Sequence, residues 1–103
     1  MIKTDSTNFG RAIGDATRQE IMRICCCEWR SVNEVADKVN VSQPTVSHHF
    51  AILREAGLVL SRKEGKQVFY KLDQQKVVAC CGKLLFTFAP EEKATKTMRG
   101  CCG

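Results

Sequence analysis

The sequence predicts a mostly α-helical fold with one small β-hairpin, arranged as a winged helix-turn-helix of about five helices and a wing. Two observations predict this fold. Two capped, amphipathic segments follow each other across a short turn within residues 31–57, and two β-rich runs flank a glycine-containing turn within residues 58–72. A chain of 103 residues is long enough for one domain with a single core. We expect residues 1–90 to form a DNA-binding and dimerisation domain, and residues 91–103 to form a flexible tail that contains cysteines.

The first helix of the predicted pair begins at a capping box. Ser31 is followed three residues later by Glu34, the spacing at which the two side chains satisfy each other's free backbone N–H groups. The helix then carries an apolar face formed by Val32, Val35, Ala36 and Val39. A short turn at Asn40 and Val41 leads to the next helix.

The second helix of the pair extends from Ser42, a favourable N-cap, to Gly57, where glycine ends it. One stripe, made of Val46, Phe50 and Leu53, has the helical spacing of a core-facing side. The other face begins with side chains that can bond to base edges and phosphates: Ser42, Gln43, Thr45, Ser47 and His48. A polar-faced helix is common on any protein surface, so the neighbouring elements decide in favour of a DNA-recognition helix.

The two β-rich runs, residues 58–63 and 67–72, are predicted to form the wing. Its basic side chains Arg62, Lys63 and Lys66 are the predicted phosphate contacts, which strengthen DNA binding without reading the base sequence. For Lys71, a solvated charge is a competing interpretation.

These residues resemble a known family, the ArsR/SmtB winged-helix repressors. The similar runs occur in the family's order at residues 42–50 (SQPTVSHHF), 53–58 (LREAGL) and 62–70 (RKEGKQVFY). Residues 14–18 (GDATR) match the family's usual Gly-Asp-Pro-Thr-Arg, with Ala16 in place of proline. The resemblance spans residues 9–75 or so, and we interpret the chain as an arsenic-responsive member.

The resemblance implies a homodimer that represses transcription from double-stranded operator DNA and leaves it when a metal or metalloid ion binds. It also implies that the first helix packs with the last one across the dimer axis, and that His49, at the family's histidine position, belongs to the DNA-binding unit. Two sensing patterns of the family are absent. Residues 31–33 are Ser-Val-Asn where many arsenic-responsive members have Cys-Val-Cys, and no histidine follows His49 for a zinc or nickel site on the last helix.

Charge and hydropathy limit the classes of function. Sixteen Lys and Arg against eleven Asp and Glu give a net charge of +5, which favours a polyanionic partner. The first ten residues lack the apolar stretch of a signal peptide, and no run of about 18 apolar residues occurs. We therefore expect a cytoplasmic protein without a membrane partner. We expect no enzyme, because there is no Cys-x-x-Cys in a βαβ setting, no nucleotide-binding loop and no Cys-His-Asp arrangement.

The segments on either side of the DNA-binding unit are predicted to be helical. Residues 5–14 have apolar side chains at helical spacing, and Asp15 caps a second helix that continues through Cys25. Asp73 caps a last helix from 74 to about 88, whose broad apolar face comprises Val77, Val78, Cys81, Leu84, Leu85 and Phe88. This face is too apolar for a small monomer, which supports a dimer independently of the resemblance.

Seven cysteines occur in three clusters, at residues 25–27, 80–81 and 101–102. Clustered thiols in a reducing compartment bind metals or respond to oxidants. We expect an inducer site of soft thiolates for arsenite, As(III), or for Sb(III), with Cd, Pb or Zn as alternatives, formed by Cys80, Cys81, Cys101 and Cys102. Cys26 and Cys27 are weaker candidates, and Cys25 continues a buried apolar stripe. In the competing interpretation Cys81 belongs to the core, Cys80 is incidental and the terminal pair binds ions adventitiously.

The expected mechanism is that the apo dimer binds an inverted-repeat operator, with each recognition helix in a major groove and each wing on the flanking backbone. The inducer ion then joins Cys80, Cys81 and a tail thiol, and changes the helix that forms the dimer interface. Two alternatives stay open. One is a repressor of the same fold that senses oxidation of its thiols, and the other is a metal-storage protein without sequence-specific DNA binding.

Overall fold

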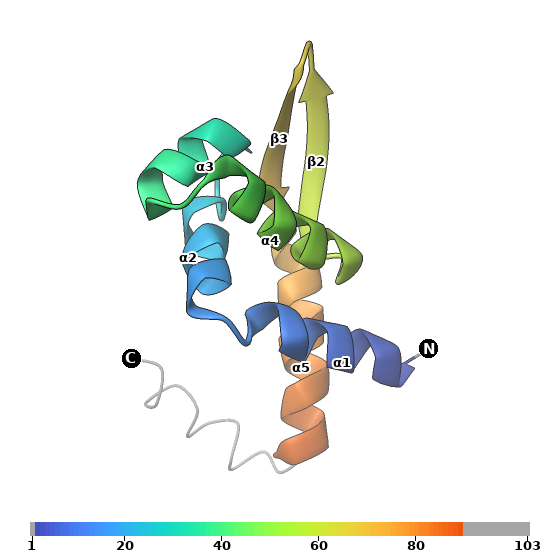
Figure 1. Cartoon of the computed structure of the whole chain (residues 1–103). Coiled ribbons are helices and arrows are strands. Elements are labelled where there is room, and N and C mark those ends of the chain that lie inside the picture. Colours follow the sequence, from blue (N-terminus) through green and yellow to red (C-terminus); the bar gives the residue numbers. More distant parts are fainter. Residues whose placement is uncertain (1, 90–103) are drawn as a thin grey trace.

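Five helices and three short strands form the part of the chain that the structure describes. The structure is a computed structural model and describes residues 2–89, with side chains from residue 7 onward. In chain order the elements are α1 (Ile2–Ile13), α2 (Ala16–Ile24), β1 (Arg30–Ser31), α3 (Val32–Val39), α4 (Gln43–Glu55), β2 (Val59–Glu64), β3 (Gln67–Leu72) and α5 (Gln74–Phe88) (Figure 1). The predicted fold class, a mostly α-helical winged helix-turn-helix, is confirmed. The predicted tail, with Cys101 and Cys102, lies outside the described residues.

The capping side chains predicted from the sequence are present at the start of their helices. The carboxylate of Asp15 accepts a hydrogen bond from the backbone N–H of Arg18 at 2.9 Å, which fixes the start of α2. At α3 the capping box is complete: Ser31 Oγ accepts from the Glu34 N–H at 3.2 Å, and Glu34 Oε1 accepts from the Ser31 N–H at 3.0 Å. Asp73 caps α5 in the same way, at 3.2 Å from the backbone nitrogen of Lys76.

Three residues in the left-handed backbone region end elements. Asn40, with φ 57°, closes α3 and starts the turn into α4. Gly57, with φ 74°, follows α4, and a Cβ atom there would lie 3.3 Å from Cε of Lys76. Gly65, with φ 62°, turns the chain between β2 and β3 at the tip of the wing.

The antiparallel sheet has three strands rather than the two predicted. Strand β3 lies in the middle, with β2 on one side and β1 on the other. In β1 only Arg30 and Ser31 pair, opposite Tyr70 and Phe69. A strand of two residues shows no alternating pattern, so it could not be identified from the sequence. It nevertheless ties the start of α3 to the wing.

The core lies between the helices and the inner end of the sheet. Its fully buried large side chains are Phe9, Ile21, Val35, Val46, Phe50, Leu53 and Leu58. The ring of Phe50 stacks on that of Tyr70, with 4.0 Å between the centroids and 8° between the planes. This contact joins the middle of α4 to β3, so the recognition helix and the wing share one core.

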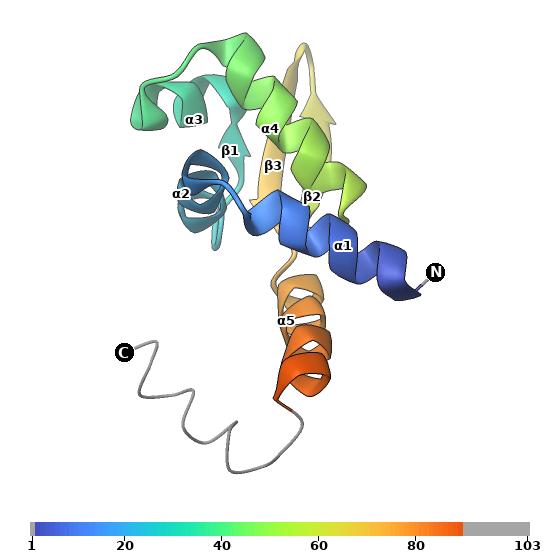
Figure 2. The same ribbon diagram turned by 60° about the horizontal axis from the view of Figure 1, so that its bottom comes forward.

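Helix α5 leads away from this body, in the direction opposite to the wing tip (Figures 1 and 2). Its apolar residues form two stripes rather than the single broad face predicted. Val77, Cys80 and Leu84 pack against the core, whereas Val78 is 70% and Phe88 79% exposed. The competing interpretation, in which Cys81 belongs to the core and Cys80 is incidental, is wrong: Cys80 is buried and Cys81 is exposed. The spacing did not distinguish the two positions, because residues 80 and 81 each lie three and four residues from Val77 and Leu84.

No helix within the described residues is both long enough and apolar enough to cross a membrane.

Candidate nucleic-acid interface and cysteine clusters

The amino-terminal half of α4 presents an exposed polar surface on a fixed support. Ser42 Oγ accepts from the backbone N–H of Thr45 at 3.4 Å and donates to Thr45 Oγ1 at 2.9 Å. The predicted contact residues Ser42, Gln43, Thr45, Ser47 and His48 are all exposed. Val46 and Phe50, on the opposite side, are fully buried. The helix can therefore offer hydrogen-bonding groups to a DNA groove without changing its packing.

His49 has a different environment from its exposed neighbour His48. It is half-buried, and its Nδ1 lies 3.2 Å from Nη1 of Arg18, an atom that can only donate. Arg18 also donates from Nε to the carbonyl of Ala12 at 2.8 Å and from Nη2 to that of Arg11 at 3.0 Å. His49 thus takes part in a junction of α1, α2 and α4.

The junction favours the neutral imidazole. Burial, opposed by the nearby Asp15 carboxylate and assisted by the charge of Arg18, lowers the pKa of His49 below its usual 6.5. With Arg18 donating to Nδ1, the proton of the neutral ring is on Nε2. Sequence reasoning missed Arg18 because its partner is 31 residues away in the chain.

The basic side chains of the wing divide into two groups. Lys63 and Lys66 are exposed near the tip. Arg62 instead lies with its guanidinium carbon 4.6 Å from the centre of the Trp29 ring, and its Nε is 2.9 Å from a carboxylate oxygen of Glu64. Arg62 therefore braces the wing against the α2–β1 turn, and Glu64 offsets part of its charge.

A shallow cleft lies between the recognition helix and the wing. It has a volume of about 270 Å³, and the predicted contact residues Gln43, Ser47 and Lys66 all line it. Asn33 and Gln67 line it too, and the sequence analysis did not select them. Their signal was weak, since each is a single exposed amide at the start of a helix or strand. The fold thus brings polar groups of α3, α4 and β3 to one surface.

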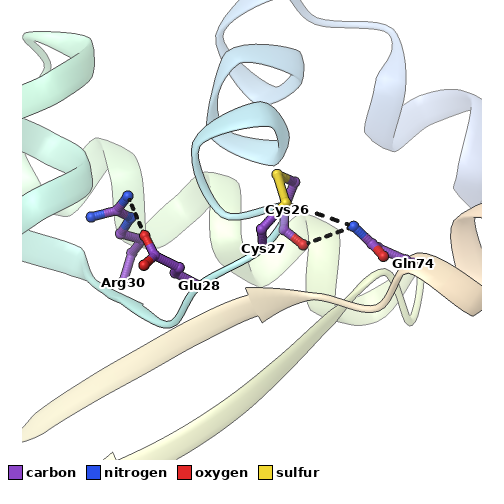
Figure 3. Close-up of a disulfide and its surroundings, with 5 residues drawn as sticks. All are labelled: Cys26, Cys27, Glu28, Arg30 and Gln74. Atoms are coloured by element: carbon purple, nitrogen blue, oxygen red, sulfur yellow. Dashed lines mark hydrogen bonds and ion pairs between the residues drawn. A yellow bond between two sulfur atoms is a disulfide. The ribbon is translucent and has the colours of Figure 1, made fainter.

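The first cysteine cluster lies in the turn between α2 and β1. Cys26 and Cys27 are joined by a disulfide, and Gln74 at the start of α5 donates from Nε2 to the Cys26 carbonyl at 3.1 Å (Figure 3). Cys25 is fully buried, and burial raises the pKa of its thiol to about 11. Cys26 and Cys27, weaker candidates for ion ligands, carry no free thiolate in this state.

The second cluster is split between two sides of α5. Cys80 is 4% exposed and packs in the core, whereas Cys81 faces outward. Partial burial, together with the neighbouring Cys80, raises the pKa of the Cys81 thiol. Among the described residues, no three His, Cys, Asp or Glu side chains are grouped so that they could hold a metal ion. The predicted site of Cys80, Cys81, Cys101 and Cys102 is thus not assembled within residues 2–89.

Comparison with known proteins decides the family. The sequence model of the family described as "Bacterial regulatory protein, arsR family" matches residues 15–61. A helix-turn-helix transcriptional regulator from Methanocaldococcus jannaschii is 36% identical over 74 residues, which cover 65% of this chain and 76% of that protein. The chain belongs to the arsR family.

Other relatives of this arsR-family chain differ in the roles that their names give. The biofilm growth-associated repressor of Agrobacterium fabrum is 44% identical over 63 residues, covering 60% of this chain and 54% of the relative. An arsenical resistance operon repressor of Escherichia coli is 37% identical over 71 residues, covering 69% and 53%. The chain thus spans about half the length of several curated relatives that it matches. These relatives are transcriptional regulators.

Solved structures agree on the fold. An ArsR-like regulator from Rhodococcus sp. RHA1 superposes with a TM-score of 0.77 over 99% of this chain and 95% of its own, at 21% identity. The homodimeric winged helix-turn-helix domain Mb0332 from Mycobacterium bovis gives a TM-score of 0.71 over 88% and 83%, at 22% identity. At these identities the likeness shows the fold alone.

Proposed function

We propose that this chain is a homodimeric transcriptional repressor that binds an inverted-repeat operator in double-stranded DNA and dissociates when a thiol-binding ion is present. The observation that carries the proposal is the exposed polar start of α4 above a fully buried stripe, beside a wing with two exposed lysines. In this geometry α4 enters a major groove and the wing follows the flanking backbone.

The residues divide into three roles at the DNA. Gln43, Thr45, Ser47 and His48 face the base edges, and Ser42 orients the start of the helix. Lys63 and Lys66 neutralise phosphates, with Arg62 holding the wing that carries them. His49 acts through Arg18 on the placement of α4, and a direct DNA contact is not needed to explain its position.

The dimer is proposed to form along the outer stripe of α5. Val78, Cys81, Leu85 and Phe88 follow each other at spacings of three and four residues, the repeat of a helix–helix seam. Val78 and Phe88 are exposed in the single chain, so a second copy would remove apolar area from water. The homodimeric state of the Mycobacterium bovis domain, which has this fold, supports the same arrangement.

The proposed inducer is trivalent arsenic or antimony bound by Cys80, Cys81 and tail thiols of Cys101 and Cys102. The names of two relatives support a metal or metalloid ligand, one being an arsenical resistance repressor and the other a cadmium resistance regulator homologue. Cys81 is exposed in the single chain and lies in the proposed dimer stripe, so an ion on its sulfur would lie at the interface, whereas Cys80 can join an ion only if its side chain leaves the core. Recruiting Cys80 would therefore disturb the contact of α5 with the body and, through the dimer, the spacing of the two α4 helices.

The test is fluorescence anisotropy on an operator-like inverted repeat under reducing conditions, titrated separately with arsenite, Sb(III), Cd²⁺, Pb²⁺, Zn²⁺ and peroxide. We expect release by arsenite near one ion per subunit, with zinc silent, and loss of that release in a Cys81→Ser variant. If only cadmium or lead releases the DNA, the inducer is an ion held by four thiolates rather than trivalent arsenic. Binding to no inverted repeat under any condition would overturn the repressor assignment in favour of metal storage.

A second candidate function, sensing of thiol oxidation, is favoured by one observation, the disulfide between Cys26 and Cys27. In that case peroxide would release the DNA without any metal.

A further inference from the structure

The turn between α2 and β1 combines several features that operator binding does not use. Its disulfide joins a half-buried residue, Cys26, to an exposed one, Cys27. Cys25 beside them stays a thiol, because it is fully buried and its sulfur is removed from solvent. One sulfur of the pair is therefore open to a reagent in solution, and the second lies next to it.

A cleft of about 370 Å³ adjoins the pair. Its charged lining residues are Arg23, Arg30, Lys38, Glu20 and Glu28. Arg23 pairs with Glu20 and Arg30 with Glu28, so the excess positive charge of the lining is that of Lys38. Arg30 pairs with Glu28 at 3.1 Å and with Glu34 at 3.6 Å, yet its buried Nε has no hydrogen-bond partner. Because this nitrogen is buried, it is not offered to an anion in the cleft, and recognition of a carboxylate there depends on Lys38.

The same turn is attached to the last helix. The carbonyl of Cys25 accepts from the backbone N–H of Leu72 at 2.9 Å, and the carbonyl of Cys26 accepts from Gln74 Nε2 at 3.1 Å. Gln74 Nε2 also lies 3.9 Å from Sγ of Cys27 (Figure 3). Gln74 is the first residue of α5, so the pair and the first turn of that helix are in direct contact.

We propose that Cys26 and Cys27 form a thiol–disulfide exchange site for low-molecular-weight disulfides that carry carboxylates, and that its oxidation state is coupled through Gln74 to operator binding. The coupling, but not the exchange chemistry, rests on the proposed repressor function.

The exchange has two steps. The thiolate of Cys27 attacks one sulfur of the external disulfide, whose S–S bond breaks and releases the first small thiol. The sulfur of Cys26 then attacks Cys27 in the mixed disulfide and displaces the second small thiol. In sum, two cysteine thiols are oxidised to the observed disulfide, the external disulfide is reduced to two thiols, and the two protons pass to them.

Trypsin separates this pair from the other cysteines, which makes the chemistry measurable in the whole protein. Cleavage after Arg23 and Arg30 yields a peptide of residues 24–30 that contains the first cluster alone, whereas Cys80 and Cys81 fall in residues 77–83. After reaction with oxidised glutathione and alkylation, we expect peptide 24–30 to carry one alkyl group instead of three. Three alkyl groups after exposure to oxidised glutathione would overturn the exchange site.

The role of the cleft is tested by the charge of the reagent. The rate of disulfide formation is compared for oxidised glutathione and for cystamine, a small disulfide that carries amines. Each rate is divided by that of a synthetic peptide of residues 24–30, which has the same thiols without the cleft. We expect the normalised rate to favour glutathione by about tenfold, and Lys38→Ala to reduce this preference. Equal normalised rates would overturn recognition of carboxylates by the cleft.

The coupling is tested in a full-length variant with Cys80→Ala, Cys81→Ser, Cys101→Ser and Cys102→Ser, which lacks the proposed inducer site. We expect its operator dissociation constant to differ about fivefold or more between the dithiol and disulfide forms, and Gln74→Ala to bring the ratio close to one. A smaller ratio before the Gln74 substitution would overturn the coupling. If peptide 24–30 oxidises but the reduced protein binds no operator, the repressor assignment fails and the exchange site stands.

Discussion

Arg18 on α2 joins two other helices, α1 and α4. One guanidinium donates to two carbonyls at the end of α1 and to the His49 ring on α4, while its own backbone N–H is held by Asp15. Hydrogen bonds of this kind, from a charged group to partly buried acceptors, are among the stronger ones in proteins. The Arg18 side chain thus adds a polar link to the apolar contacts between the recognition helix and α1.

We predict that Arg18→Ala lowers the free energy of unfolding by about 2 kcal/mol, because it leaves the Ala12 carbonyl and the His49 nitrogen without a donor. Urea denaturation followed by circular dichroism measures the change. Arg11→Ala, an exposed arginine on α1, is the matched control and should cost less than about 0.5 kcal/mol. Equal losses for both variants would mean that the junction contributes nothing specific.

His49 makes stability depend on pH. Its pKa is lowered in the folded state, so the unfolded chain binds the proton more readily, and acid favours unfolding. The contribution is complete above the unfolded pKa of 6.5 and is lost as the pH falls toward the lower folded pKa. We predict that in His49→Gln the urea midpoint changes less with pH, between about pH 7.5 and pH 5.5, than it does in the parent protein. An unchanged slope in this variant would assign the acid sensitivity to other groups.

Interactions between residues close in the chain could be predicted from the sequence, and those between distant residues could not. The caps at Asp15, Ser31, Ser42 and Asp73 act within three residues, and the structure confirms each of them. Partners far apart in the chain left no pattern in the sequence, as with Arg18 and His49 or Arg62 and Trp29. Which of Cys80 and Cys81 belongs to the core could not be predicted, because both lie three and four residues from Val77 and Leu84 on α5.

At the scale of elements, the wing carries the sequence-independent part of DNA binding. Its stem is held by the Arg62–Trp29 contact and by the pairing of β1 with β3, which leaves the lysines near the tip exposed. A held stem with exposed charges suits phosphate contacts, which weaken as salt rises because the counterions released from DNA then gain less entropy.

We predict that Lys66→Ala weakens binding to operator and to unrelated duplex DNA by similar factors. It should also reduce the slope of log K against log salt concentration by about 1.8 for the dimer, since each subunit loses one neutralised phosphate worth about 0.9. Anisotropy titrations at several salt concentrations measure the slope. Lys83→Ala, on α5, is the control that removes the same charge at a distance from the wing and should leave the slope unchanged. An unaltered slope in Lys66→Ala would exclude a phosphate contact.

The boundaries of α4, of the hairpin and of α5 were predictable because their capping residues, glycines and apolar periodicity agree with one another. Strand β1 could not be predicted, because it consists of two residues that are extended only through their pairing with β3 and show no pattern of their own. The candidate DNA surface followed from α4 and the wing, whereas the contribution of Asn33 and Gln67 to their shared cleft required the tertiary structure.

At the scale of the whole molecule, the direction of α5 links the proposed dimer to DNA. This helix leads away from the wing, and α1 crosses it near the body, so a twin chain docked on α5 would leave both α4 helices free (Figure 2). Two recognition helices read an inverted repeat only when a symmetric interface fixes their separation at about one turn of DNA, roughly 34 Å. Operator affinity should therefore depend on residues that touch no DNA.

We predict that Val78→Glu converts the protein to a monomer and weakens operator binding by tenfold or more, because it places a charge in the proposed outer stripe of α5. The side chain is 70% exposed in the single chain, so the fold of the monomer should be retained, which circular dichroism verifies. Phe86→Glu is the matched control: Phe86 is 71% exposed on the same helix but lies off the stripe. Sedimentation equilibrium gives the mass of each variant. A dimeric Val78→Glu protein, or one that is monomeric yet binds the operator like the parent chain, would place the interface elsewhere or make it dispensable for recognition.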